Sequence, residues 1–164
     1  MRGSLKTLVL GGLGGLALGL AAWYFGGVGF WAGEADNSLL RPADRETVTL
    51  GALVYAAHCA VCHGAQLEGE ADWQTPNPDG TMPAPPHDAT GHTWHHSSEL
   101  LFAMTKYGVA KAAGLDGHLS NMPGYRDILS DEEIIAVLSF IKSSWPAGIR
   151  ARHDALDDRL SSRN

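Results

Sequence analysis

Two cysteines and one histidine lie within five consecutive residues, Cys59-Ala60-Val61-Cys62-His63. Thiolates and imidazole nitrogens bind transition metals, and two nearby thiols can also form a reversible disulfide. These two cysteines are the only ones in the chain, so a framework of several disulfides is excluded. The chemistry that this segment supports is therefore confined to one short stretch of the chain.

Three kinds of site use cysteines at this spacing. A redox-active C-x-x-C pair normally lies near a βαβ pattern, and this chain shows no credible series of strands. A structural zinc site needs four ligands and usually a second cysteine pair, which the chain lacks. The third kind is the C-x-x-C-H pattern of covalent haem c attachment, in which both thiols bind the haem and the histidine ligates its iron. The pattern favours one haem c, bound through Cys59, Cys62 and His63.

A second axial ligand for the iron has to come from another part of the chain. A thioether is a soft, neutral donor, and methionine opposite histidine raises the reduction potential of a haem relative to two histidines. Met122 lies in a loop stiffened by proline and glycine, shortly before the last predicted core helix, and is the favoured ligand. His118 and Met82 remain alternatives, whereas Met104 lies on the apolar face of a predicted helix.

Helical periodicity predicts an element that ends at the cysteine motif. The segment from Thr49 to His58 repeats apolar residues at helical spacing. Its expected buried face consists of Leu50, Leu53, Val54 and Ala57. This helix would deliver the motif at its carboxyl end.

Two further helices are predicted downstream. Ser97 is a candidate N-cap for a helix from Ser98 to Tyr107. Ser130 and Glu133 form a capping box for a helix with apolar residues at helical spacing, which Pro146 ends. Its apolar positions are Ile134, Val137, Leu138, Ile141 and Trp145.

The expected fold class is all-α, a small globule of short helices and long loops around one covalent haem. Residues 64–96 show no sustained periodicity and are interpreted as a long ordered loop, which a compact domain tolerates when the loop wraps something. We expect a linker at 34–46, the haem-binding domain at 47–146 and a polar tail at 147–164.

The N-terminal region predicts a membrane anchor at residues 1–33. From Thr7 to Gly33 there is no charged residue, which exceeds the roughly 20 residues needed to cross a bilayer. Arg2 and Lys6 precede this segment, so the positive-inside rule leaves the N-terminus in the cytoplasm. A cleaved secretory signal is the alternative. Both interpretations export the cysteine-bearing domain, and the retained anchor implies a single-pass membrane protein with this domain outside the cytoplasm; the family resemblance described below implies that the membrane is the bacterial inner membrane and the compartment the periplasm.

The charge balance limits the partners. The chain has 18 acidic and 12 basic residues, a formal net charge of −6. Nucleic acids recruit clustered lysine and arginine, so nucleic-acid binding is excluded as the main function. An acidic surface suits docking against a basic patch on a protein partner.

With these residues in place, the sequence from Thr47 to Trp145 resembles class I c-type cytochromes, in particular the single-haem, membrane-anchored bacterial kind. The resemblance implies that the first and last core helices cross, with Gly51, Tyr55 and Phe140 at the crossing. It implies that a proline carbonyl, assigned to Pro85, accepts a hydrogen bond from the ligand histidine. His87 stands where a leucine often packs on the haem.

The resemblance implies an electron carrier rather than an enzyme. Its expected partners are a quinol-cytochrome c oxidoreductase as donor, a terminal oxidase or reaction centre as acceptor, and the lipid bilayer through residues 7–33. The alternatives are a haem-bearing electron-entry subunit of a larger oxidase or dehydrogenase, and an enzyme or gas sensor with an open sixth position. The lysine ring that mitochondrial members use for docking is absent from this acidic chain.

Residues 92–96 add a group of histidines around a tryptophan. His92, His95 and His96 could bind a second metal, or could belong to an exposed polar loop, which is the favoured interpretation. Trp94 is a candidate neighbour of a haem propionate. Three other aromatic residues either line the haem pocket or pack in the core: Tyr107, Tyr125 and Trp145.

Overall fold

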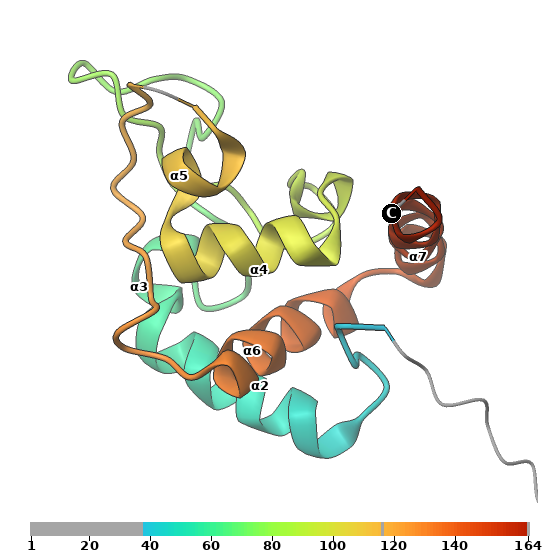
Figure 1. The fold of residues 1–164 in the computed structure, drawn as a ribbon. Helices are drawn as coiled ribbons and strands as arrows, with labels where there is room; N and C mark the ends of the chain where they lie inside the picture. The colour runs from blue at the N-terminus through green and yellow to red at the C-terminus, as the bar shows by residue number, and fades with distance from the viewer. Residues whose placement is uncertain (1–37, 116, 164) are drawn as a thin grey trace, which may run out of the picture. The chain divides into compact units, whose positions relative to one another are not determined.

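From residue 38 onwards, the chain consists of helices joined by long loops (Figure 1). The computed structural model describes residues 38–115 and 117–163. Its elements, in chain order, are α2 (Arg45–His58), α3 (Ala60–His63), the 3-10 helix η1 (Thr93–His95), α4 (Ser98–Tyr107), α5 (Val109–Ala113), α6 (Asp131–Ser144) and α7 (Ala147–Ser161). These described residues contain no strand, so the predicted all-α class is confirmed for this part of the chain.

The predicted membrane anchor, residues 7–33, lies outside the described residues, as does the start of the predicted linker. Among the helices of the described part, none combines the length and the apolar character needed to cross a bilayer.

Side chains cap the helices where the sequence indicated. Ser97 Oγ accepts a hydrogen bond from the amide of Leu100 at 3.3 Å, and α4 follows with the predicted bounds. The Ser130 hydroxyl accepts from the Glu133 amide at 3.3 Å while the Glu133 carboxylate accepts from the Ser130 amide at 2.8 Å. Both predicted caps are therefore confirmed. Helix α2 begins earlier than predicted because the carboxylate of Asp44 caps it.

Helices α2 and α6 cross in close contact (Figure 1). Gly51 lies at the crossing, and a Cβ atom built there would be 2.0 Å from the carbonyl oxygen of Ala136. Because no side chain fits into this space, glycine allows the two backbones to approach. Further along α2, the Tyr55 ring packs on the Phe140 ring with 5.4 Å between centroids. These contacts agree with the crossing that the resemblance implied.

The buried face of α2 differs from the predicted one. Leu50 is 37% and Leu53 is 68% exposed, and Ala57 is also exposed. The residues that α2 buries are Thr47, Gly51, Val54 and Tyr55. The contact at Gly51 turns this side of the helix towards α6 and leaves the leucines on the other side. A count of apolar side chains misses this arrangement because glycine contributes no side chain to the count.

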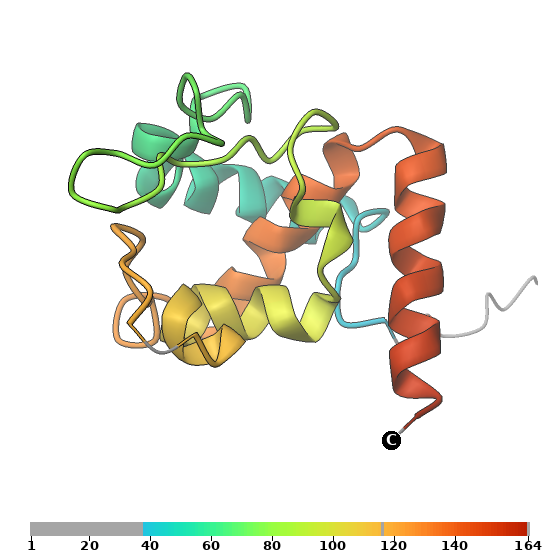
Figure 2. The ribbon, with the colours of Figure 1, turned by 90° about the horizontal axis from the view of Figure 1, so that it is seen from above.

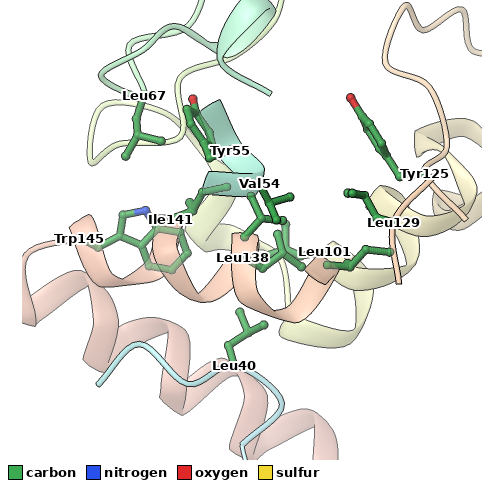
Figure 3. Close-up of a cluster of buried hydrophobic side chains, with 12 residues drawn as sticks. Leu40, Val54, Tyr55, Leu67, Leu101, Tyr125, Leu129, Leu138, Ile141 and Trp145 are labelled. Atoms are coloured by element: carbon green, nitrogen blue, oxygen red, sulfur yellow. The ribbon is translucent and has the colours of Figure 1, made fainter. Parts of the chain in front are cut away.

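The core lies between α2, α4 and α6 (Figure 3). Its buried members are Leu40, Val54, Tyr55, Leu67, Leu101, Tyr125, Leu129, Ile134, Val137, Leu138, Ile141 and Trp145. Leu40 is fully buried, and the amide of Arg41 donates to Ser139 Oγ at 2.9 Å. Both residues belong to the predicted linker 34–46, so the end of that segment is part of the core.

Most of the predicted polar tail, 147–164, forms helix α7 (Figure 2). The carboxylate of Asp157 accepts from the amide and the hydroxyl of Ser98, at the start of α4, at 2.9 and 2.6 Å. The ammonium of Lys142, which is 1% exposed, lies 2.6 Å from a carboxylate oxygen of Asp154. Polar contacts to α4 and α6 hold this helix, which is why its sequence shows little apolar periodicity.

His153 is the residue that α7 buries most completely. Its side chain has no exposed surface, and its ring lies 5.1 Å from the ring of Trp145. Its Nδ1 lies 3.5 Å from a carboxylate oxygen of Asp157. Burial lowers the pKa of His153 below its ordinary value of 6.5, and the charge of Lys142 acts in the same direction, while Asp157 and Asp154 oppose the shift.

The depressed pKa of His153 predicts a loss of stability in acid. As the pH falls below about 6.5, the unfolded chain binds more protons than the folded protein, so the free energy of unfolding decreases. We expect the wild-type protein to lose more stability than the His153→Gln variant between about pH 7 and about pH 5, measured by chemical denaturation. The two proteins differ only at residue 153, so equal losses would contradict the prediction.

Candidate functional site

The cysteine motif forms a tight turn directly after α2. Cys59 ends α2 and begins the single turn α3. The amide of His63 donates to the carbonyl of Cys59 at 2.9 Å, as in a helix. Cys59 is half-buried and Cys62 is exposed, and both carry free thiols. Because residues three apart share one side of a helical turn, the two sulfur atoms are placed to reach one planar group.

The environment of Cys59 favours its protonated form. Burial, with a contribution from Cys62, raises the pKa of the Cys59 thiol to about 11. A thiol that stays protonated at neutral pH is protected from oxidation. Addition of its S–H bond across a vinyl double bond forms a C–S and a C–H bond and needs no oxidant. Two free thiols on one turn, with Cys59 kept protonated, therefore fit thioether formation with a vinyl-bearing cofactor.

His63 is held as a neutral imidazole. Its side chain is buried, and Nδ1 donates to the carbonyl oxygen of Pro85 at 2.9 Å. Burial lowers the pKa of His63, and the bond to Pro85 and the charge of Glu70 oppose this shift only in part. Since Nδ1 carries the proton, Nε2 has a free lone pair, which is the form that ligates a metal. This is the hydrogen bond that the resemblance assigned to Pro85.

The loop after His63 folds back to bring Pro85 to this position. The amide of Gly69 donates to the carbonyl of His63 at 2.8 Å, and the amide of Glu70 donates to the carbonyl of Ala84 at 2.8 Å. Gly69 has a φ of +69°, and a Cβ atom there would lie 2.5 Å from the nitrogen of Pro86. The loop therefore needs glycine at this position for its backbone conformation and for the close approach of the proline segment.

A second histidine lies against the first. The rings of His63 and His87 are stacked, with 4.0 Å between centroids and 25° between planes. Nδ1 of His87 donates to the hydroxyl oxygen of Thr93 at 2.8 Å. Burial lowers the pKa of His87 to about 3, with His63 and His92 adding to the effect, so His87 is neutral. From the sequence, His87 stood out only because similar cytochromes often have leucine at this place, and nothing in the sequence pointed to Thr93.

The segment that carries Met122 is tied to the cysteine motif and to α4. The hydroxyl of Tyr125 donates to the carbonyl of His58 at 2.9 Å, next to Cys59. Gly124 lies so close to α4 that a Cβ atom there would be 2.9 Å from the Tyr107 carbonyl carbon. Met122 is half-buried and packs against the core, as does Cys59. Figure 2 shows the 64–92 loop and the segment after α5 at the same end of the molecule.

The two alternative ligands are more exposed. Met82 is 38% exposed, and His118 is also exposed. The loop of Met82 nevertheless touches that of Met122, because Asn121 Nδ2 donates to Thr81 Oγ1 at 3.3 Å. Met82 is therefore the natural comparison for any test of Met122.

Trp94 lies in η1, half-buried and packed against the core. Its ring stacks on that of His95 with 3.7 Å between centroids. The indole Nε1 is buried and has no hydrogen-bond partner among the described residues. A buried donor without an acceptor is costly in a folded protein, so this atom points to an acceptor outside the described residues, such as a bound group.

The remaining candidates have structural contacts. The His92 ring stacks on Trp73 at 5.3 Å and meets His96 edge-on at 5.4 Å. In the described part of the chain, no group of three or more histidine, cysteine, aspartate or glutamate side chains could hold a metal ion. Tyr125 and Trp145 belong to the core, whereas Tyr107 is 42% exposed.

Together these groups fit a haem c: two thiols on one turn, a neutral imidazole with a free Nε2, and an unpartnered indole donor. A family model described as Cytochrome c matches residues 48–145, which contain all of these groups. No curated protein and no solved structure matches the chain. Because the match covers more than half of the chain, the protein belongs to the cytochrome c family, whose members bind covalent haem c.

The loop geometry predicts different costs for two glycine substitutions. Gly69 and Gly114 both have positive φ, at +69° and +64°, but only Gly69 has backbone atoms where a Cβ would be placed. We expect Gly114→Ala to cost about 1 kcal/mol of unfolding free energy and Gly69→Ala about 1–3 kcal/mol more. Only Gly69→Ala should also shift the reduction potential, because it displaces the proline segment that binds His63. Denaturation and potentiometry of the haem-loaded variants test this, and equal behaviour would contradict it.

Proposed function

We propose that this cytochrome c family member is a single-haem electron carrier of the class I type. The observation that carries the proposal is the tautomer of His63, with the proton on Nδ1 and a free lone pair on Nε2. Its Nδ1 is bound to the Pro85 carbonyl at 2.9 Å, which leaves Nε2 as the ligand nitrogen next to the two thiols. Haem c attached at Cys59 and Cys62 supplies an iron that alternates between Fe(II) and Fe(III).

Met122 is the proposed second axial ligand. It is the half-buried methionine of a segment whose position is set by the Tyr125–His58 hydrogen bond and by the contact of Gly124 with α4. These two contacts hold the chain just after Met122, and the hydrogen bond from Asn121 to Thr81 holds it just before, which favours a sulfur ligand kept in one place.

Two side-chain ligands would leave no open coordination position. Electron transfer requires none, whereas an enzyme or a gas sensor needs a site where a small molecule reaches the iron. The chain then contributes by holding His63 and Met122 and by excluding water from between them. We therefore infer a carrier rather than an enzyme.

Trp94 is proposed to donate its indole N–H to a haem propionate. The support is its buried Nε1, which lacks a partner among the described residues. A propionate carboxylate would satisfy this donor with a charge-assisted hydrogen bond.

The proposed place of action is the periplasmic side of a bacterial inner membrane. The uncharged segment 7–33 supports an anchor, and tethering would raise the concentration of the haem domain near membrane complexes. The proposed donor is a quinol-cytochrome c oxidoreductase, and the proposed acceptor is a terminal oxidase or reaction centre. The excess of acidic residues supports partners with basic docking surfaces.

The ligand assignment predicts different results for two methionine substitutions. Met122→Ala should abolish the weak charge-transfer band that methionine–iron ligation gives in the oxidised protein, and should lower the reduction potential. Met82→Ala, on the adjacent loop, is the matched control and should retain both. Visible spectroscopy and potentiometry of protein from a haem-maturing host provide the readout. Loss of the band in Met82→Ala alone would assign the ligand to Met82 and contradict the proposal.

The carrier proposal also predicts how the full-length protein behaves on extraction. After mild detergent extraction, the haem protein should elute apart from larger complexes and should exchange electrons reversibly as a separate species. Retention of the residue 1–33 segment, read by intact mass together with one haem, would support the anchor. Quantitative co-elution with an oxidase or dehydrogenase would instead establish a fixed electron-entry subunit.

A further inference from the structure

His87 makes a contact with His63 that haem ligation does not require. The two rings lie face to face, with 4.0 Å between centroids and only 25° between planes. A hydrogen bond from Nδ1 to the Pro85 carbonyl restrains one edge of the His63 ring. A single hydrogen bond at one edge still allows the ring to swing, whereas a flat group against its face limits that rotation.

The orientation of His87 is itself held at three points. Its Nδ1 donates to Thr93 Oγ1 at 2.8 Å. Its backbone amide donates to the carbonyl of Leu67 at 2.8 Å, and its carbonyl accepts from Trp145 Nε1 at 2.8 Å. The ring therefore has a fixed backbone and a fixed side-chain rotation, as a rigid support requires.

Thr93 is placed to serve this purpose. It is buried in η1, and its hydroxyl donates to the carbonyl of Pro86 at 3.4 Å while its oxygen accepts from His87. The hydroxyl proton is thus directed away from His87, which leaves the oxygen as the acceptor. Glycine at position 91 lets the chain before Thr93 pass close to Pro86, since a Cβ atom on Gly91 would lie 1.9 Å from the Pro86 carbonyl oxygen.

We propose that His87, held by Thr93, is a positioning residue that sets the rotation of the His63 ring about its bond to the haem iron. The inference rests on the proposed function, in which His63 ligates that iron. Rotation of an axial imidazole relative to the haem changes the overlap of its orbitals with those of the iron. A second residue that controls this rotation therefore tunes the electronic state of the iron without contacting it.

The test uses the haem-loaded full-length protein and four variants. Thr93→Val removes the acceptor hydroxyl but keeps the shape, and Thr93→Ser restores a hydroxyl. His87→Leu removes the stacked ring. Thr90→Val is the matched control, because the Thr90 hydroxyl is exposed and bonds to Asp88 at 2.6 Å. The readouts are the haem-methyl proton shifts of the oxidised protein in NMR and the reduction potential.

We expect the spread of the four haem-methyl shifts to narrow in Thr93→Val and His87→Leu, because a freer His63 ring averages over several orientations. The one-electron equilibrium should change by about threefold, which corresponds to about 30 mV. Thr93→Ser and Thr90→Val should match the wild type. An unchanged shift pattern in Thr93→Val or His87→Leu would overturn the inference. If His87→Leu does not take up haem, the Thr93 pair decides alone.

Different experimental results would contradict this inference and the proposed function. A His63→Ala variant that keeps the wild-type low-spin spectrum would show that His63 is not a ligand and would remove the proposed function. Normal ligation by His63 together with insensitivity to Thr93→Val would remove only the positioning role of His87.

Discussion

The approach of α2 to α6 at Gly51 is the contact on which the site depends. A Cβ atom at Gly51 would lie 2.0 Å from the Ala136 carbonyl oxygen, so the helices are as close as their backbones allow. The carboxyl end of α2 carries Cys59, and that of α6 leads into Trp145, whose indole binds the His87 carbonyl. The distance between the helices therefore determines where both the thiols and the histidine pair lie.

The long loop after His63 does more than connect two helices, because several of its residues position the His63 side chain. It returns Pro85 to Nδ1 of His63, then places His87 on the face of the same ring and Thr93 behind His87. Each contact restrains a different motion of the imidazole. Ordering so many loop residues costs conformational entropy, and long ordered loops in compact domains are usually functional.

Helix α7 extends the fold beyond the part that matches the family model, which ends at residue 145. It is fastened by polar groups: Asp157 binds the start of α4, and Asp154 pairs with the buried ammonium of Lys142. His153 packs against the ring of Trp145 and interacts electrostatically with both members of this pair. Since Trp145 also binds the His87 carbonyl, the packing of α7 and the support of the haem ligand share one residue.

The amino-acid sequence by itself determined what depends on neighbours along the chain. The C-x-x-C-H motif, the caps Ser97 and Ser130 and the all-α class follow from local spacing, and Pro85 followed from the family resemblance. Only the tertiary structure decided which face of α2 is buried, because the contact of Gly51 with α6 sets that face, and not the number of apolar side chains on it. It also decided the burial of Leu40, the helix α7 and the His63–His87–Thr93 arrangement. These features arise between residues distant in sequence or within an irregular loop, where no periodic pattern records which groups will meet.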